Sequence, residues 1–164
     1  QQAAAVLERF LDAAVPGIAT AEGALYTLAD TDFLLHLCTH LYKEATVYDW
    51  VRMGRDLSLY KFCDIYLILR ELSSEQADTL AEAASSCGLE KESYYSFSYT
   101  CRLFDIHTPQ TDALLSRLRP EDDAFMTEIV YPSQGKWFTY AMDPVDWLFC
   151  SDRRSRLQEI KKEA

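Results

Sequence analysis

Residues 31–72 read TDFLLHLCTHLYKEATVYDWVRMGRDLSLYKFCDIYLILREL and have the densest apolar periodicity in the chain. On a helix that advances by about 100° per residue, His36, His40 and Lys43 fall on one narrow stripe. Apolar residues fill most of the remaining circumference. Because a helix that is apolar on nearly all sides is buried, the polar stripe is predicted to face a cleft or a polar partner.

A second polar pair lies on the next predicted helix. Lys61 and Asp64 share one stripe of it by helical spacing, while Leu59, Phe62 and Tyr66 lie on its apolar side. If the two helices pack together, the cations line one pocket that receives phosphate oxygens, and Asp64 orients one of them. The predicted substrate-binding residues are therefore His36, His40, Lys43, Lys61 and Asp64.

The composition is that of an ordinary globular protein. The chain has 164 residues, 49% of them apolar, and a formal net charge of -10. Nonspecific binding to nucleic acid or to an anionic membrane is not expected, because both need a positive field. The five cysteines form no C-x-x-C pair, and there is no signal peptide or apolar run of membrane length, so we expect reduced thiols in a cytoplasmic protein.

Local patterns predict a mainly α fold: a helical bundle with a short N-terminal β element and a small C-terminal β-hairpin. The length favours one domain over residues 1–164. Its expected parts are a helix and short β element (1–28), a helical core (29–119), and a hairpin with a C-terminal helix (120–164).

Several helix boundaries have end signals. Ser73 and Gln76 have the spacing of a capping box, and Gly88 is typical of the position after a helix C-terminus. The helix predicted over 90–106 is rich in aromatic residues, whose helical spacing predicts core packing. Ser151-Asp152 is predicted to cap a last helix with a basic, solvated face.

The two histidines have three possible roles. Their spacing of four residues suits zinc, but a zincin helix also needs a Glu where Leu37 stands, and a third ligand, so no metal site is predicted. They could instead be interior, hydrogen-bonded histidines, which is the interpretation we favour. They could also line the phosphate-binding cleft described above.

Asp30-Thr31-Asp32 has the form of a metal-binding D-x-D. Such carboxylates act in phosphoryl transfer from a rigid strand, next to a glycine-rich turn. No such turn precedes this segment, and helical periodicity follows it. It is therefore predicted to cap a helix, and no catalytic residue is predicted.

Two blocks resemble a known family. LYTLADTDFLLHLCTHLYKEA (25–45) and LSLYKFCDIYLILREL (57–72) are similar to the C-terminal helical half of an uncharacterised bacterial nucleotidyltransferase family of the polymerase-β-like superfamily. In that family a short strand precedes a helix of the form L-x-x-x-D-x-L-L-H-L-x-x-H-x-x-K, and a helix of the form L-x-K/R-x-x-D-I/L follows. The positions that carry over are Asp32, His36, His40, Lys43, Lys61 and Asp64.

The resemblance implies an upstream polymerase-β-like domain with a glycine-containing turn and D-x-D carboxylates. Nothing in this chain matches that domain, and the chain opens with Gln1-Gln2-Ala3 inside a helical pattern, without an initiating Met. We therefore expect an N-terminal catalytic part to be absent and Mg²⁺ to belong to that part. The helical half would contribute to binding a nucleotide, a phosphate or an acceptor, without catalysing transfer alone.

Two other classes of function remain open. The aromatic segment 94–104 and a loop with Trp50 could make the chain a helical protein–protein interaction module without enzymatic activity, with a protein partner or as a homodimer. A metal-dependent hydrolase that uses His36 and His40 is the third hypothesis.

Overall fold

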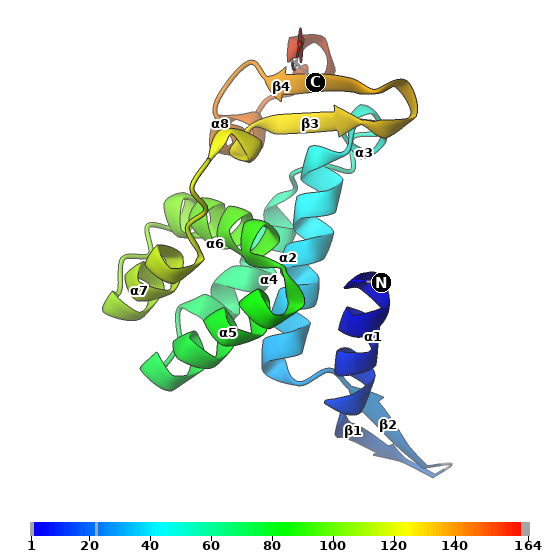
Figure 1. Cartoon of the computed structure of the whole chain (residues 1–164), viewed down its shortest axis with the longest axis vertical. Helices are drawn as coiled ribbons and strands as arrows, with labels where there is room; N and C mark the ends of the chain where they lie inside the picture. The colour runs from blue at the N-terminus through cyan, green and yellow to red at the C-terminus, as the bar shows by residue number, and fades with distance from the viewer. Residues whose placement is uncertain (1, 22, 162–164) are drawn as a thin grey trace.

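A helical bundle forms the body of the molecule, with a two-stranded hairpin at one end and a three-stranded sheet at the other (Figure 1). The computed structural model describes residues 2–21 and 23–161. Its α-helices are α1 (Gln2–Asp12), α2 (Asp30–Thr46), α3 (Tyr48–Arg52), α4 (Leu59–Leu69), α5 (Ser74–Cys87), α6 (Glu90–Phe104), α7 (Pro109–Leu118) and α8 (Pro144–Trp147). Its strands are β1 (Val15–Thr20), β2 (Gly23–Thr27), β3 (Glu128–Tyr131), β4 (Lys136–Tyr140) and β5 (Leu157–Ile160). The predicted mainly α class is confirmed.

Helix α2 is the long central element, against which α4, α5 and α6 pack (Figure 1). Leu34, Cys38, Leu41 and Ala45 recur at spacings of three and four, and all four are buried on this packed side. Ala29 occupies the N-cap position without a side-chain hydrogen bond. The predicted cap at Asp30-Thr31-Asp32 is therefore wrong in detail, because this segment forms the first turn of the helix, where carboxylates favour the helix dipole.

The predicted boundaries of α5 are confirmed. Ser73 and Gln76 form a capping box, and Gly88 ends the helix with a left-handed backbone at φ 65°. Helix α6 is part of the core, with Tyr95 and Phe97 completely buried, so the predicted core role of its aromatic residues is also confirmed. No helix among the described residues is long and apolar enough to cross a lipid bilayer.

The C-terminal hairpin is confirmed, and a third strand extends it. Strands β3 and β4 pair antiparallel, with Val130 opposite Trp137, and β5 pairs antiparallel with the other edge of β4. The predicted C-terminal helix is therefore wrong: a 3-10 turn (Arg153–Arg156) leads into β5 instead. The physical reason is nonlocal, because the open edge of β4 offers the backbone hydrogen bonds that a strand can use.

The sheet is fixed to the bundle by buried contacts. The Trp147 indole N–H donates a hydrogen bond to Asp56 Oδ2 over 2.6 Å, and the Tyr140 hydroxyl donates to the carbonyl oxygen of Ala45. A single parallel bridge also joins Val47, between α2 and α3, to Val130 on β3. These contacts hold the end of α2 against the edge of the sheet.

The predicted N-terminal helix ends at Asp12, because Val15 already pairs with Thr27 in an antiparallel hairpin, which is the predicted short β element. All the described side chains of β1 and β2 are exposed. Arg9 of α1 forms an ion pair with the buried Asp32 of α2, with 3.0 Å between Nε and Oδ1. Helix α1, β1 and β2 together form the N-terminal arm of the molecule.

Candidate functional site

The polar stripe of α2 exists, and it faces solvent. His36, His40 and Lys43 are all exposed, and the two imidazole rings meet edge to face with their centroids 6.2 Å apart. The interpretation of these residues as interior histidines is therefore wrong. The physical reason is that the apolar periodicity of α2 indicates which side packs, and the three polar side chains lie away from that side, where they remain exposed.

Lys61 is held in a network that the sequence did not predict. Its ammonium group forms an ion pair with Glu44 Oε2, and it donates hydrogen bonds to the carbonyl oxygens of Arg55 and Asp56 over 2.8 and 2.9 Å. The Lys61 and Glu44 side chains are only 12% and 10% exposed. Lys61 therefore fixes the segment before α4 onto α2, since a mostly buried ammonium group needs acceptors of this kind.

Glu44 also contacts the predicted stripe. His40 Nδ1 lies 3.5 Å from Glu44 Oε2, one helical turn away. Glu44 thus has the orienting role that the sequence analysis gave to Asp64. The signal for it was available, because Glu44 follows His40 at i+4 on the same helix, but its pairing with Lys61 depends on how two helices pack.

His40, Lys61 and Asp64 do come together. They line a small cavity of about 110 Å³ between α2 and α4, together with Leu37, Leu41 and Tyr60. Asp64 is exposed at this cavity. The space is smaller than the about 300 Å³ typical of sites for small organic ligands, so it suits at most a small anion or an ordered water.

The other two predicted residues line different hollows. His36 contributes to a mainly apolar groove of about 430 Å³ between α1 and α2, which also contains Glu92. Lys43 contributes to a cavity of about 400 Å³ between the bundle and the C-terminal sheet. The five predicted residues are therefore spread over three neighbouring hollows along α2 rather than gathered in one pocket.

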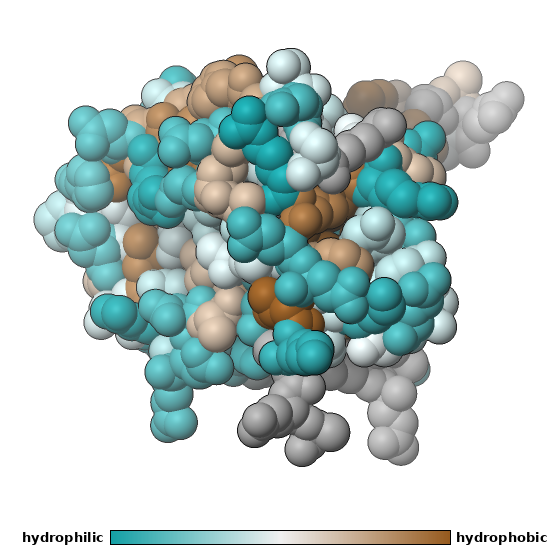
Figure 2. Space-filling view, turned by 90° about the horizontal axis from the view of Figure 1, so that it is seen from above, coloured by the Kyte–Doolittle hydropathy of each residue, from teal (hydrophilic) through white to brown (hydrophobic). Residues whose placement is uncertain are grey.

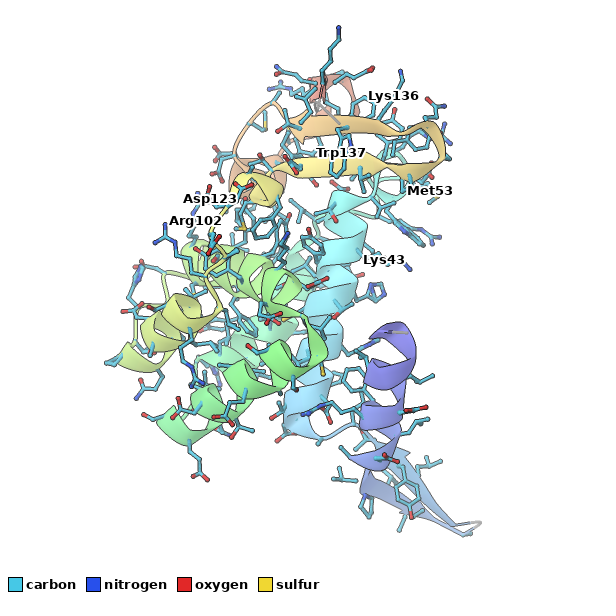
Figure 3. All side chains as sticks on the ribbon, in the orientation of Figure 1. Lys43, Met53, Arg102, Asp123, Lys136 and Trp137 are labelled. Carbon is cyan, nitrogen blue, oxygen red and sulfur yellow. The ribbon has the colours of Figure 1, made fainter. Side chains whose placement is uncertain are left out.

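Trp50 adds an aromatic centre to the cationic end of the stripe. The Lys43 ammonium lies 5.9 Å from the centroid of its ring, and the Arg55 guanidinium lies 5.8 Å from the same centroid. Such cation–π contacts hold long side chains in place while their charges stay accessible. In Figure 3, Lys43 on α2 and Trp137 on β4 lie where the bundle meets the sheet, whereas Arg102 and Asp123 lie on the other side.

Burial and pairing limit the chemistry of two cysteines and of the D-x-D segment. Burial raises the pKa of Cys38 far above its ordinary value and that of Cys101 to about 11, so both thiols are inert at neutral pH. Within residues 2–21 and 23–161, no three His, Cys, Asp or Glu side chains are grouped to hold a metal ion. Asp32, which is paired with Arg9, does not fit a Mg²⁺ site with Asp30.

The sequence model of one protein family matches this chain. The family is described as an uncharacterised nucleotidyltransferase, and the match covers residues 2–105, which is more than half of the chain. The matched region contains all five predicted substrate-binding residues and ends at the C-terminus of α6. Comparison with curated proteins gives no match, and neither does comparison with solved structures.

Proposed function

We propose that this chain, which belongs to the uncharacterised nucleotidyltransferase family, is a helical substrate-side domain that binds the phosphate groups of a nucleotide or of an acceptor. The binding residues are His36, His40 and Lys43 on the exposed stripe of α2. The domain does not transfer a nucleotide by itself, because its D-x-D segment does not fit a metal site, and any Mg²⁺ would be held by another part of the protein.

The observation that carries this proposal is the row of exposed hydrogen-bond donors on the stripe, with Lys43 at one end. The whole chain has a net charge of -10, yet His36, His40 and Lys43 lie exposed in a row on α2. Arg55 extends the cationic surface beyond Lys43 across the ring of Trp50. A local concentration of donors and positive charge on an acidic protein attracts anions, and phosphate oxygens accept from imidazole and ammonium groups alike.

Lys61 and Asp64 have supporting roles in this proposal. Lys61 positions Glu44 and the segment that carries Arg55, and Glu44 in turn orients the His40 ring. Asp64, at the rim of the small cavity beside His40, limits how close a second anion can approach. Of the five predicted residues, His36, His40 and Lys43 contact the ligand.

Isothermal titration of the purified chain with tripolyphosphate and with nucleoside triphosphates, with and without Mg²⁺, tests the proposal. We expect Lys43→Ala to weaken binding on the order of tenfold, because one charge-assisted contact is lost. Lys136→Ala is the matched control, since Lys136 is an exposed lysine on β4 that pairs with Glu159. Absence of any binding, or an equal loss in both variants, would overturn the proposal.

A second function is favoured by the N-terminal arm. On α6, Tyr95, Phe97 and Tyr99 are buried and Tyr94 and Phe104 are partly buried, so this helix does not present the aromatic surface expected for an interaction module. Leu7 and Leu11 of α1, Ile18 of β1 and Tyr26 of β2 are instead exposed together on the arm. Several exposed apolar side chains on one part of the molecule fit the surface of a protein partner or of a second copy of this chain.

Light scattering coupled to size-exclusion chromatography separates the two functions. Under the second one, the chain self-associates or binds its partner through the arm, and Leu11→Glu abolishes this. Leu67→Glu serves as the control, because Leu67 is an exposed leucine on α4, at 52% against 67% for Leu11. A monomer that binds tripolyphosphate and is unaffected by either substitution supports the first function alone.

A further inference from the structure

A cavity of about 400 Å³ lies where the end of α2 and the start of α6 meet β3 and β4. Its lining includes Lys43, Lys91, Phe125, Glu128, Val130 and Trp137. We propose that this cavity binds a nucleoside polyphosphate, with the base against Trp137 and the phosphates at Lys43 and Lys91. The inference rests on the proposed phosphate-binding function and extends it to the nucleoside part of the ligand.

The sheet wall of the cavity follows from the strand register. Glu128 and Val130 are two residues apart on β3, so their side chains project from the same face. Trp137 lies directly opposite Val130 on β4 and therefore projects from that face too. The opposite face carries Ile129, which is completely buried, and packs into the core. The sheet thus presents an aromatic ring and a carboxylate to the cavity.

The bundle wall of the cavity supplies the positive charge. Lys43 lies in the last turn of α2, and Lys91 is the second residue of α6, and both are exposed. The Lys91 ammonium lies 5.7 Å from the centroid of the Phe125 ring, and Lys43 is placed in the same way beside Trp50. Two ammonium groups from different helices therefore border one cavity.

The two walls define an orientation for the ligand. An aromatic base can stack on Trp137 regardless of its identity, because every base has a π-face. Glu128 lies on the same face of the sheet, opposite Thr139, and can accept hydrogen bonds from the amino or imino groups of a base, while its charge repels phosphates. The phosphates are thus directed to the lysines of the bundle wall. A ligand with an aromatic end and an anionic end fits both walls.

Size and composition distinguish this cavity from the other hollows. Its volume lies within the about 300–1,000 Å³ of typical ligand sites, unlike that of the cavity at Asp64. The groove beside α1 is similar in size, but its described lining is mainly apolar, and its polar residues are His36, Thr39 and Glu92 rather than lysines. In the hollow between α6 and α7, Arg102 is already bound to Asp143 over 2.7 Å. Seen from above, the sheet end is mostly hydrophilic, with apolar side chains showing between the polar ones (Figure 2).

The cavity crosses the C-terminal boundary of the family match. Phe125, Glu128, Val130 and Trp137 lie outside the region that matches the family, whereas Lys43 and Lys91 lie inside it. The family part would therefore bind phosphate, and the C-terminal sheet of this chain would supply the contacts to the base. Loss of the sheet contacts should reduce discrimination between nucleotides and simple polyphosphates.

The test compares tripolyphosphate with the four ribonucleoside triphosphates by isothermal titration of the whole chain. We expect at least one nucleotide to bind on the order of tenfold more tightly than tripolyphosphate. Trp137→Ala and the milder Trp137→Leu should remove this excess while leaving tripolyphosphate binding unchanged, which also shows that the variants are folded. Lys91→Ala should weaken both ligands, and Phe149→Ala, at an exposed aromatic residue elsewhere, should change neither.

The outcomes separate this inference from the proposed function. If neither ligand binds the unmodified chain, both are overturned. If tripolyphosphate and all four nucleotides bind equally, the phosphate-binding function stands and the base site is overturned. The base site is also overturned if both Trp137 variants bind nucleotides as the unmodified chain does.

Discussion

The C-terminal sheet and the N-terminal arm attach to opposite ends of α2 in different ways. At the sheet end, Trp147 is 0% exposed and donates a hydrogen bond to the carboxylate of Asp56, which is 1% exposed. At the arm end, the ion pair between Arg9 and Asp32 makes the polar link, and Leu7 and Leu11 of α1 remain exposed. The sheet shares the core of the bundle, whereas the arm lies against its surface.

The boundaries of the family match do not correspond to how firmly the arm and the sheet are packed against the bundle. The match begins at residue 2 and ends at residue 105, so it includes the loosely packed arm and excludes the deeply packed sheet. Trp147 and Tyr140 nevertheless supply donors to Asp56 and Ala45 within the matched region. The cooperative folding unit of this chain is therefore expected to be larger than the matched region at its C-terminal side.

The largest effect is expected from Trp147→Ala. The substitution opens a large cavity and leaves the buried Asp56 carboxylate without its indole donor, so we expect a loss of about 4 kcal/mol in the free energy of unfolding. Urea unfolding followed by far-ultraviolet circular dichroism measures it. Phe149→Ala, two residues away at a side chain that is 71% exposed, should change stability by less than about 0.5 kcal/mol. A variant whose bundle unfolds at the original urea concentration would contradict the shared core.

The next largest effect is expected from Lys61→Met. It leaves the Glu44 carboxylate near the interior without its cation, which should cost about 2 to 3 kcal/mol because the pair is mostly buried. Adding Glu44→Gln should restore part of this loss, and a double-mutant cycle gives the coupling energy. Strictly additive losses would show that the two groups do not interact in solution.

A smaller and local effect is expected from Arg9→Ala. Without its partner, Asp32 regains solvent most easily if α1 moves away, at a cost of about 1 kcal/mol. Hydrogen exchange should become faster in α1, while the urea midpoint of the bundle stays unchanged. Arg70→Ala, which breaks an exposed pair with Glu71, should affect neither measurement. If Arg9→Ala instead lowers the urea midpoint of the bundle, the arm belongs to the core.

The smallest effect is expected from Glu92→Gln, on α6 beside the arm. Desolvation by burial raises the pKa of Glu92 above its ordinary value of 4.5, so the ionised side chain opposes folding. Above the raised pKa, the variant should therefore be more stable than the unmodified chain. This difference in the free energy of unfolding should shrink as the pH falls and disappear below pH 4.5.

The gain should stay below about 1 kcal/mol, because the carboxylate is only partly buried. Thermal unfolding at pH 7 and at pH 4 measures it, with Glu121→Gln at an exposed position as the control. A gain that is the same at both pH values would mean that ionisation is not its cause.

Sequence reasoning succeeded where the signal is local. The capping box at Ser73 and the left-handed end at Gly88 depend on residues within a few positions, and both were predictable. Strand β5 was not, because Leu157–Ile160 is extended only through the open edge of β4. The stripe of His36, His40 and Lys43 was also predictable as a helix face.

The surroundings of the stripe were beyond sequence reasoning. Periodicity shows which residues share a face, but it does not show whether another element covers that face. The acceptors of Lys61 come from Glu44, 17 residues away, and from two carbonyl oxygens of a loop. The position of Trp137 in the wall of the cavity beside Lys43 could not be predicted for the same reason, since only tertiary packing brings β4 to the end of α2.

Val47 has an extended backbone (φ -105°, ψ 121°) and is both the C-cap of α2 and the N-cap of α3. The same residue pairs with Val130, and its carbonyl oxygen accepts a hydrogen bond from the backbone N–H of Trp50 over 3.0 Å. One residue thus connects two helices and a strand. If a ligand fills the neighbouring cavity and tilts β3, the movement reaches Val47 through its pairing with Val130. Because Trp50 is hydrogen-bonded to Val47, its indole should report the movement as a change in fluorescence.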